Sequence, residues 1–249
     1  MPRRASISLP GVSVNLIQRG NNRSACLYAD EDYLFYLDVL EAQAKKHGCA
    51  IHAWCLMTNH VHLLATPESP DSAGLMMKGL GQRYVHYVNR TYRRSGTLWE
   101  GRFRSCLMQE EAYVLACYRY IEMNPVRAGM VEHPAEYRWS SYRANAQGEP
   151  SVQRCPHPLY HALGRDEVFR TEAYRELFRY QLDPGLVDQI RAATNGNYAL
   201  GSQKFSAEVE AALGEGSQEA RQGVPRARQI FSKTWFAPLY ARCVTCFCR

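Results

Sequence analysis

Residues 49–66 read CAIHAWCLMTNHVHLLAT, and this stretch decides the fold. It predicts a β-hairpin whose turn is Thr58-Asn59. Side chains alternate between the two faces of a strand, so His60 and His62 share one face while Val61 points into the core. Two imidazoles on one face make half of a metal site, although a polar strand face with two solvated histidines would show the same pattern.

The elements predicted around this hairpin follow the order β-α-β-β-α-β-α. In chain order they are a strand over 11–19, a helix over 31–47, the hairpin strands over 49–57 and 60–66, a helix over 72–94, a strand over 98–108 and a helix that ends near 124. Gly79 and Gly81 are expected to interrupt the second helix. The order is typical of an α+β, ferredoxin-like fold, an antiparallel sheet with helices on one face. RNA-recognition domains share it, but this sequence lacks their glycine- and aromatic-rich strand signature.

The helix that ends at Asn124-Pro125 carries a second group of candidate functional side chains. Tyr120 and Asn124 are four residues apart, so both project from one face if the helix continues through Asn124. A phenol and a carboxamide could then face the histidine pair across one cleft. A buried tyrosine on a helix is ordinarily a core residue, and that interpretation of Tyr120 stays open.

Three segments of the chain resemble the single-tyrosine HUH transposases. They are His60-Val61-His62, residues 98–103 and residues 120–129, and they occur in the family's order. Within this family the chain is most similar to the REP-associated tyrosine transposases, which its opening residues 1–4 also resemble. The resemblance extends to about residue 145. It implies the HUH endonuclease type of ferredoxin-like fold.

The resemblance implies a catalytic role for four residues. Tyr120 would be the nucleophile, and His60, His62 and Asn124 would hold a divalent metal. Oxygen-rich phosphate coordination suits Mg²⁺ or Mn²⁺, although histidine ligands alone would also accept Zn²⁺. The substrate would be single-stranded DNA with hairpin repeats, cut and rejoined through a 5′-phosphotyrosine. Tyr118 is a poor alternative because it lies on a different helical face and has no partner four residues on.

Arginines and aromatic residues alternate in residues 83–104, which suits single-stranded nucleic acid because arginines bind phosphates and rings stack on bases. A solvated amphipathic helix is the alternative, and we favour it for the first half of the segment. A basic N-terminal arm is expected to contact DNA beside the hairpin. The predicted DNA-binding residues are Arg3, Arg4, Arg19, Arg93, Arg94, Arg102 and Arg104.

Three other classes of function compete with this interpretation. A rolling-circle relaxase uses similar ligands, but in that family the tyrosine precedes the histidine motif. A two-metal nuclease needs clustered acidic residues, which the sequence near His60 does not supply. The main alternative is a non-catalytic, ferredoxin-like protein that binds single-stranded nucleic acid.

The 249 residues predict a transposase domain over 1–147 and a proline-rich linker over 148–158. A helical C-terminal extension is expected over 159–222, with helices at 172–182, 186–193 and 205–213, followed by a tail over 223–249 without a recognisable pattern. The extension could cover the edge of the domain that dimeric relatives use. We therefore expect a monomer, with a dimer as the alternative.

The composition predicts a cytoplasmic protein. The sequence has no run of 18 apolar residues and no apolar segment after its basic start, so neither a membrane span nor a signal peptide is expected. Nine cysteines, an odd number and mostly scattered, indicate reduced thiols. The one cluster, Cys243, Cys246 and Cys248, lacks a second ligand pair at zinc-finger spacing.

Overall fold

The computed structural model describes residues 7–213 of the chain. Four strands are present in this part: β1 (Val14–Arg19), β2 (Cys49–Met57), β3 (His60–Pro67) and β4 (Arg104–Leu107). The helices are α1 (Asp30–His47), α2 (Ser72–Thr91), α3 (Glu110–Glu122), α4 (Asn124–Arg127), α5 (Tyr142–Ala146), α6 (Pro158–His161), α7 (Glu167–Glu176), α8 (Pro184–Gly196) and α9 (Gln203–Leu213). No helix of the described part is long and apolar enough to cross a membrane.

The four strands form one antiparallel sheet in the order β2-β3-β1-β4. The register places His60 opposite Arg19 and His62 opposite Ile17 on the neighbouring strand β1. One end of the sheet therefore gathers the last residues of β1 and β2 and the first residues of β3 and β4. The predicted ferredoxin-like order of elements is confirmed.

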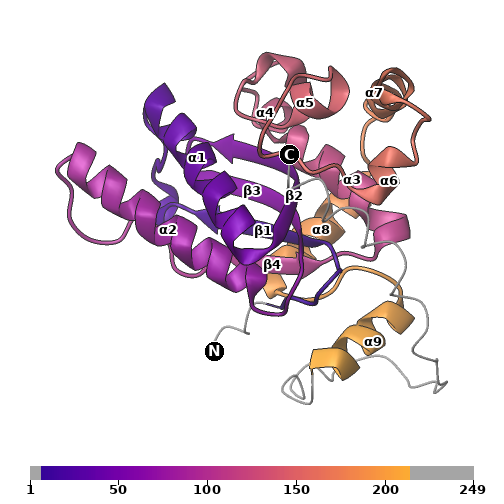
Figure 1. Ribbon diagram of the computed structural model, residues 1–249, viewed down its shortest axis with the longest axis horizontal. Helices are drawn as coiled ribbons and strands as arrows, with labels where there is room; N and C mark the ends of the chain where they lie inside the picture. Colours follow the sequence, from indigo (N-terminus) through magenta and orange to yellow (C-terminus); the bar gives the residue numbers. More distant parts are fainter. Residues whose placement is uncertain (1–6, 214–249) are drawn as a thin grey trace.

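Helices α1 and α2 lie side by side on one face of the sheet (Figure 1). Val61 and Leu63 point into the apolar cluster beneath them, as strand alternation predicts. Gly79 lets the two helices approach closely, because a Cβ atom there would lie 2.0 Å from Oε1 of Gln43 on α1. Gly79 thus serves packing, and the expected interruption of this helix does not occur.

The opposite face of the sheet is also covered, by α3 and α8 (Figure 1). Leu64 of β3 packs there with Cys106 of β4 and with Ile190 of α8. The predicted α+β class is confirmed, but helices cover both faces rather than one. The physical reason is the run of apolar residues after His62, because a strand buried on both faces needs apolar side chains on both.

Strand β4 is shorter than predicted, and the residues before it form a loop. Within the segment 98–108, which was predicted as a strand, only residues 104–107 form a regular ladder with β1. Gly101 has φ 142°, and Glu100 donates its backbone N–H to the Arg19 carbonyl at 2.9 Å. The loop is thereby folded against the end of β1, which brings its side chains to the histidine end of the sheet.

Two of the C-terminal helices, α7 and α8, begin where an aspartate caps them. Asp166 accepts a hydrogen bond from the Phe169 N–H, and Asp183 accepts one from the Leu186 N–H. As a result, α7 and α8 each start earlier than the sequence predicted. Arg3, Arg4, the three clustered cysteines and the tail lie outside the described residues, and the predicted domain boundaries stay a prediction.

Candidate active site

A cleft of about 440 Å³ opens at the end of the sheet where β3 begins. Its lining includes Tyr120, His60, His62 and Asn124, the four residues that the sequence assigned to catalysis. The other lining residues are Ile17, Arg19, Arg23, Met57, Glu100, Gly101, Arg102, Arg104, Arg127, Ala128, Arg191 and Asn195. A larger and more open hollow beside α7 contains no histidine or tyrosine, so the cleft is the candidate site.

The histidine pair lies at the start of β3. The rings of His60 and His62 are 4.9 Å apart between centroids and inclined by 74°. Nδ1 of His60 is 2.6 Å from the Asn59 side-chain oxygen, so Nδ1 carries the proton and Nε2 keeps a free lone pair. His62 is buried, and its Nδ1 has no hydrogen-bond partner in the described structure.

Both imidazoles are neutral at pH 7. Burial and the nearby charge of Arg19 lower the pKa of His60 to about 4. Burial also lowers the pKa of His62, with further contributions from His60, Arg127 and Arg19. A metal ligand must be unprotonated, so this state of the pair is the one that metal binding requires.

Tyr120 faces the histidines from the last turn of α3. Its ring is edge-on to His62, with 5.7 Å between the centroids, and only 4% of the residue is exposed. Tyr118 instead lies in the core, where its ring packs on Tyr160 and Tyr174 and its hydroxyl accepts the His157 N–H. The structure therefore brings Tyr120, and not Tyr118, into the cleft.

Asn124 reaches the same cleft from a separate helix. The α3 helix ends at Glu122, and Asn124 is the first residue of α4, so the helix does not continue unbroken as the spacing argument assumed. Its amide group donates to the Ile121 carbonyl at 3.2 Å and accepts from Arg127 at 2.8 Å. The carboxamide is thus held in place by residues of its own segment.

The residues present fit a divalent metal in part. The candidate ligands are two neutral imidazoles and the amide oxygen of Asn124, so the donor set carries no charge. The buried Nδ1 of His62 has no hydrogen-bond partner in the described structure, so a metal could take this nitrogen as a ligand. The Asn124 oxygen is already bonded to Arg127, which leaves one lone pair. Within residues 7–213 no group of three or more histidine, cysteine, aspartate or glutamate side chains could hold a metal.

Residues 8–124 match the model of the family described as "Transposase IS200 like". This part of the chain is similar to the IS200-like transposase family. A curated protein of Haemophilus influenzae named "Putative REP-associated tyrosine transposase" is 27% identical over 108 residues. The match covers 39% of this chain and 61% of that relative's length.

A solved structure of a REP-associated tyrosine transposase bound to a REP hairpin is also similar. It superimposes with a TM-score of 0.50 at 19% identity, and the match covers 63% of this chain and 92% of that one. At this identity the likeness concerns the fold. It covers more of this chain than the family model does, in keeping with the packing of later segments against the sheet.

The predicted DNA-binding arginines divide into two groups in the structure. Arg19, Arg102 and Arg104 line the cleft. Arg93 and Arg94 follow the end of α2 outside it, where the Arg94 guanidinium donates to the Tyr28 hydroxyl and lies 5.9 Å from that ring. Both groups stay predictions as DNA contacts.

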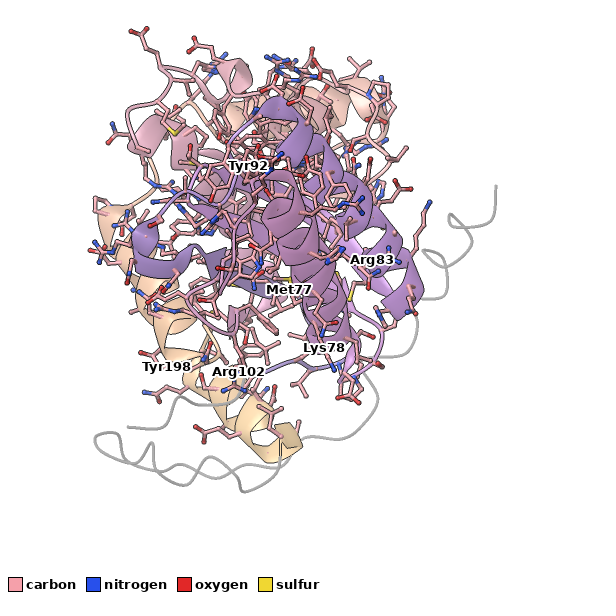
Figure 2. The ribbon with its side chains drawn as sticks, turned by 90° about the vertical axis from the view of Figure 1, so that its left-hand side faces the viewer. Met77, Lys78, Arg83, Tyr92, Arg102 and Tyr198 are labelled. Atoms are coloured by element: carbon pink, nitrogen blue, oxygen red, sulfur yellow. The ribbon has the colours of Figure 1, made fainter. Side chains whose placement is uncertain are left out.

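Three further arginines line the cleft without having been singled out. Arg127 was visible in the motif around Tyr120, and Arg23 follows the predicted first strand. No sequence motif marks Arg191, because α8 reaches the cleft only through its packing against distant parts of the chain. Asn195 of α8 accepts a hydrogen bond from Arg104, and the Ser105 N–H donates to Asn197 at 2.8 Å. Figure 2 labels Arg102 of the cleft lining and Tyr198, which follows α8, both in the lower part of the view.

Proposed function

We propose that this chain cuts and rejoins hairpin-bearing single-stranded DNA through a single-tyrosine, metal-dependent mechanism. The observation that carries the proposal is the position of Tyr120, which lies edge-on to His62 in a cleft lined by six arginines and a single carboxylate among the described residues. A phenol beside neutral imidazoles and a positive surface is suited to attack on a phosphodiester.

The chemistry of the step follows from the groups present. The Tyr120 oxygen forms a bond to phosphorus, the bond from phosphorus to the 3′ oxygen breaks, and the phenol proton ends on the freed 3′ oxygen. The product is a 5′-phosphotyrosine that retains the energy of the ester, so a second 3′-hydroxyl can reverse the step without ATP. Burial raises the pKa of Tyr120, so the hydroxyl enters the step protonated at neutral pH.

A divalent metal, Mg²⁺ or Mn²⁺, would be held by His60, His62 and Asn124. When bound, it would supply a Lewis acid that polarises the scissile phosphate. The protein's own contribution is orientation, because the Asn59 bond fixes the His60 ring and the Arg127 bond fixes the Asn124 amide.

The proposed substrate is a folded single strand. The six arginines in the cleft can neutralise the phosphates of a strand. Outside the cleft, the partly exposed rings of Tyr28 and Tyr92 lie beside Arg94 and could stack on bases. The similar solved protein was bound to a REP hairpin, which supports the same class of partner here. Such a substrate, together with free cysteines in the described part, supports a cytoplasmic site of action.

A non-catalytic protein that binds single-stranded nucleic acid is the second candidate. The same arginines and rings would serve it, but it has no use for a buried phenol beside two neutral imidazoles. Loss of any one of Tyr120, His60 or His62 would have favoured this candidate, and all three line the cleft.

A cleavage assay separates the two candidates. The purified chain is incubated with a labelled single strand carrying a hairpin, and in parallel with the same sequence as a duplex, with Mn²⁺ or with a chelator. The proposal expects strand cleavage of the single strand in Mn²⁺ only. Tight hairpin binding without cleavage in any divalent metal would favour the binding protein.

A further inference from the structure

Two arginines converge on Tyr120 from distant parts of the chain. The Arg127 guanidinium lies 4.6 Å from the centroid of the Tyr120 ring and donates to the Tyr120 carbonyl. Arg191, on α8, lines the same cleft as Tyr120 and Arg127, and its charge opposes the rise in the pKa of Tyr120 that burial causes. Arg127 and Arg191 therefore face one cleft from two separate elements, and burial together with the charge of Arg191 lowers the pKa of Arg127.

This pair of cations is only partly neutralised by the protein. Arg191 pairs with Asp188 at 3.3 Å, but that contact is exposed and lies on the surface of α8. Within residues 7–213 Arg127 has no ion pair, and Glu100, the carboxylate in the cleft lining, lies 3.9 Å from Arg104. Like charges held close together repel one another, so the arrangement is stabilised when an anion lies between them.

We propose that Arg127 and Arg191 form a clamp for the phosphate that Tyr120 attacks, which makes α8 part of the catalytic site. The inference rests on the proposed function. A guanidinium presents paired N–H donors that match two phosphate oxygens. These oxygens stay anionic while the bond from phosphorus to Tyr120 forms and the bond to the 3′ oxygen breaks. The clamp therefore stabilises the transition state of cleavage and, in rejoining, holds the phosphotyrosine.

The position of α8 is fixed by buried contacts rather than by the clamp itself. Thr194 accepts a hydrogen bond from the Asn15 side chain of β1 at 3.0 Å, and both residues are fully buried. Arg191 lies one helical turn before Thr194 and is half exposed, with its side chain toward the cleft. A substitution of Arg191 can thus remove the guanidinium without displacing the helix.

The first test measures the covalent step. Single-turnover formation of the protein–DNA adduct, with enzyme in excess and Mn²⁺ present, is compared for the wild type, Arg191→Ala, Arg191→Lys and Gln189→Ala. Gln189 is exposed on the same helix but on a different face. The clamp predicts a rate about 100-fold lower for Arg191→Ala, since a donor to the reacting oxygens is lost, and an intermediate rate for Arg191→Lys. Hairpin affinity should fall less than the rate, and Gln189→Ala should match the wild type.

The second test does not depend on cleavage. Inorganic phosphate is titrated into each variant at low ionic strength and its binding is followed by calorimetry. Wild type should bind phosphate in the millimolar range, as estimated for a small exposed anion site, and Arg191→Ala should bind at least tenfold more weakly, with Gln189→Ala unchanged.

The outcomes separate the two claims. Phosphate binding that depends on Arg191 in a chain that forms no adduct supports the clamp and contradicts the proposed function. An adduct that forms at the wild-type rate in Arg191→Ala overturns the clamp and leaves the proposed function standing. Equal losses in Arg191→Ala and Gln189→Ala would trace the effect to the helix as a whole and would also overturn the clamp.

Discussion

The side-chain oxygen of Asn124 accepts a hydrogen bond from Arg127 at 2.8 Å, and the same oxygen is the proposed third metal ligand. A guanidinium so near to a ligand atom repels a cation. We predict that Arg127→Ala binds Mn²⁺ about fivefold more tightly in the absence of DNA, a change of roughly 1 kcal/mol. Calorimetry or electron paramagnetic resonance of Mn²⁺ measures the affinity.

Arg102→Ala is the matched control for this prediction. Arg102 lines the same cleft and carries the same charge, and no hydrogen bond joins it to Asn124 in the described structure. An equal gain in affinity in both variants would show that net charge alone opposes the metal, and would contradict the role given to the Asn124 contact.

The residues of the candidate site differ in how far the sequence could predict them. His60 and His62 were placed on one face because strand alternation leaves no other choice. Tyr120 and Asn124 line one cleft even though a helix break separates them, since Met123 keeps φ and ψ near −84° and 0°. Arg191 could not be foreseen, because its position depends on how α8 packs, and no local pattern encodes that.

At the scale of elements, a buried histidine joins the segment before α6 to the sheet. His52 of β2 contacts the Cys155 carbonyl through Nδ1 at 2.6 Å and the Thr66 hydroxyl through Nε2 at 2.7 Å. Burial, with the nearby His157, lowers the pKa of His52 to about 3. The folded state therefore requires the neutral ring.

This shift in pKa sets the sign of a pH dependence. The unfolded chain takes up the His52 proton below about pH 6.5 while the folded chain does not. The contribution of His52 to the free energy of unfolding should thus be constant above that pH, and it should fall by about 1.4 kcal/mol per pH unit as the pH drops toward 3. In His52→Gln, which cannot take up a proton, chemical denaturation between pH 7 and 5 should show a shallower fall. Parallel pH dependences would rule out this role of His52.

The buried bond between α8 and β1 provides a second test at this scale. Thr194→Val removes the acceptor for the Asn15 amide, whose Oδ1 already has no partner in the described structure. We expect a loss of about 1–3 kcal/mol in the free energy of unfolding, the cost of a buried donor left unpaired. The control is Thr97→Val, at an exposed loop residue, and its free energy of unfolding in the same denaturant titration should equal that of the wild type. Equal stability of the two variants would mean that this bond does not hold α8.

The elements themselves were largely predictable, and the exceptions have local causes. The hydrophobic period located α1, α2, β2 and β3 close to their observed bounds. The sequence could not show that Gly79 serves the contact with Gln43, nor that residues 98–103 turn back against β1, because both depend on partners distant in sequence.

At the scale of the whole molecule, the free edge of β4 is covered by the chain itself. The Leu200 N–H donates to the Leu107 carbonyl at 2.8 Å, and the Gln109 N–H donates to the Leu200 carbonyl at 3.0 Å. An edge already paired in this way is less available to a second chain. We predict a monomer, so light scattering at micromolar concentration should give the 28.4 kDa mass of one chain. Twice that mass would contradict the prediction.

The whole fold joins segments that the sequence treated separately. Tyr118 of α3 packs on Tyr160 and Tyr174, which belong to the predicted helical extension. The predicted separation into a domain and an extension rested on a proline-rich stretch. Composition can indicate a proline-rich stretch, but it does not show whether the segments before and after the stretch pack against each other.

The central claim is that Tyr120 becomes covalently joined to DNA, and peptide mass spectrometry tests it most directly. The wild type, Tyr120→Phe and Tyr118→Phe are incubated with a hairpin-bearing single strand and Mn²⁺, and the adducts are digested with nuclease and protease. The account predicts a 5′-phosphate on the peptide that contains Tyr120, in the wild type and in Tyr118→Phe, and none in Tyr120→Phe. A phosphate that persists in Tyr120→Phe, or one on any other tyrosine, would contradict it.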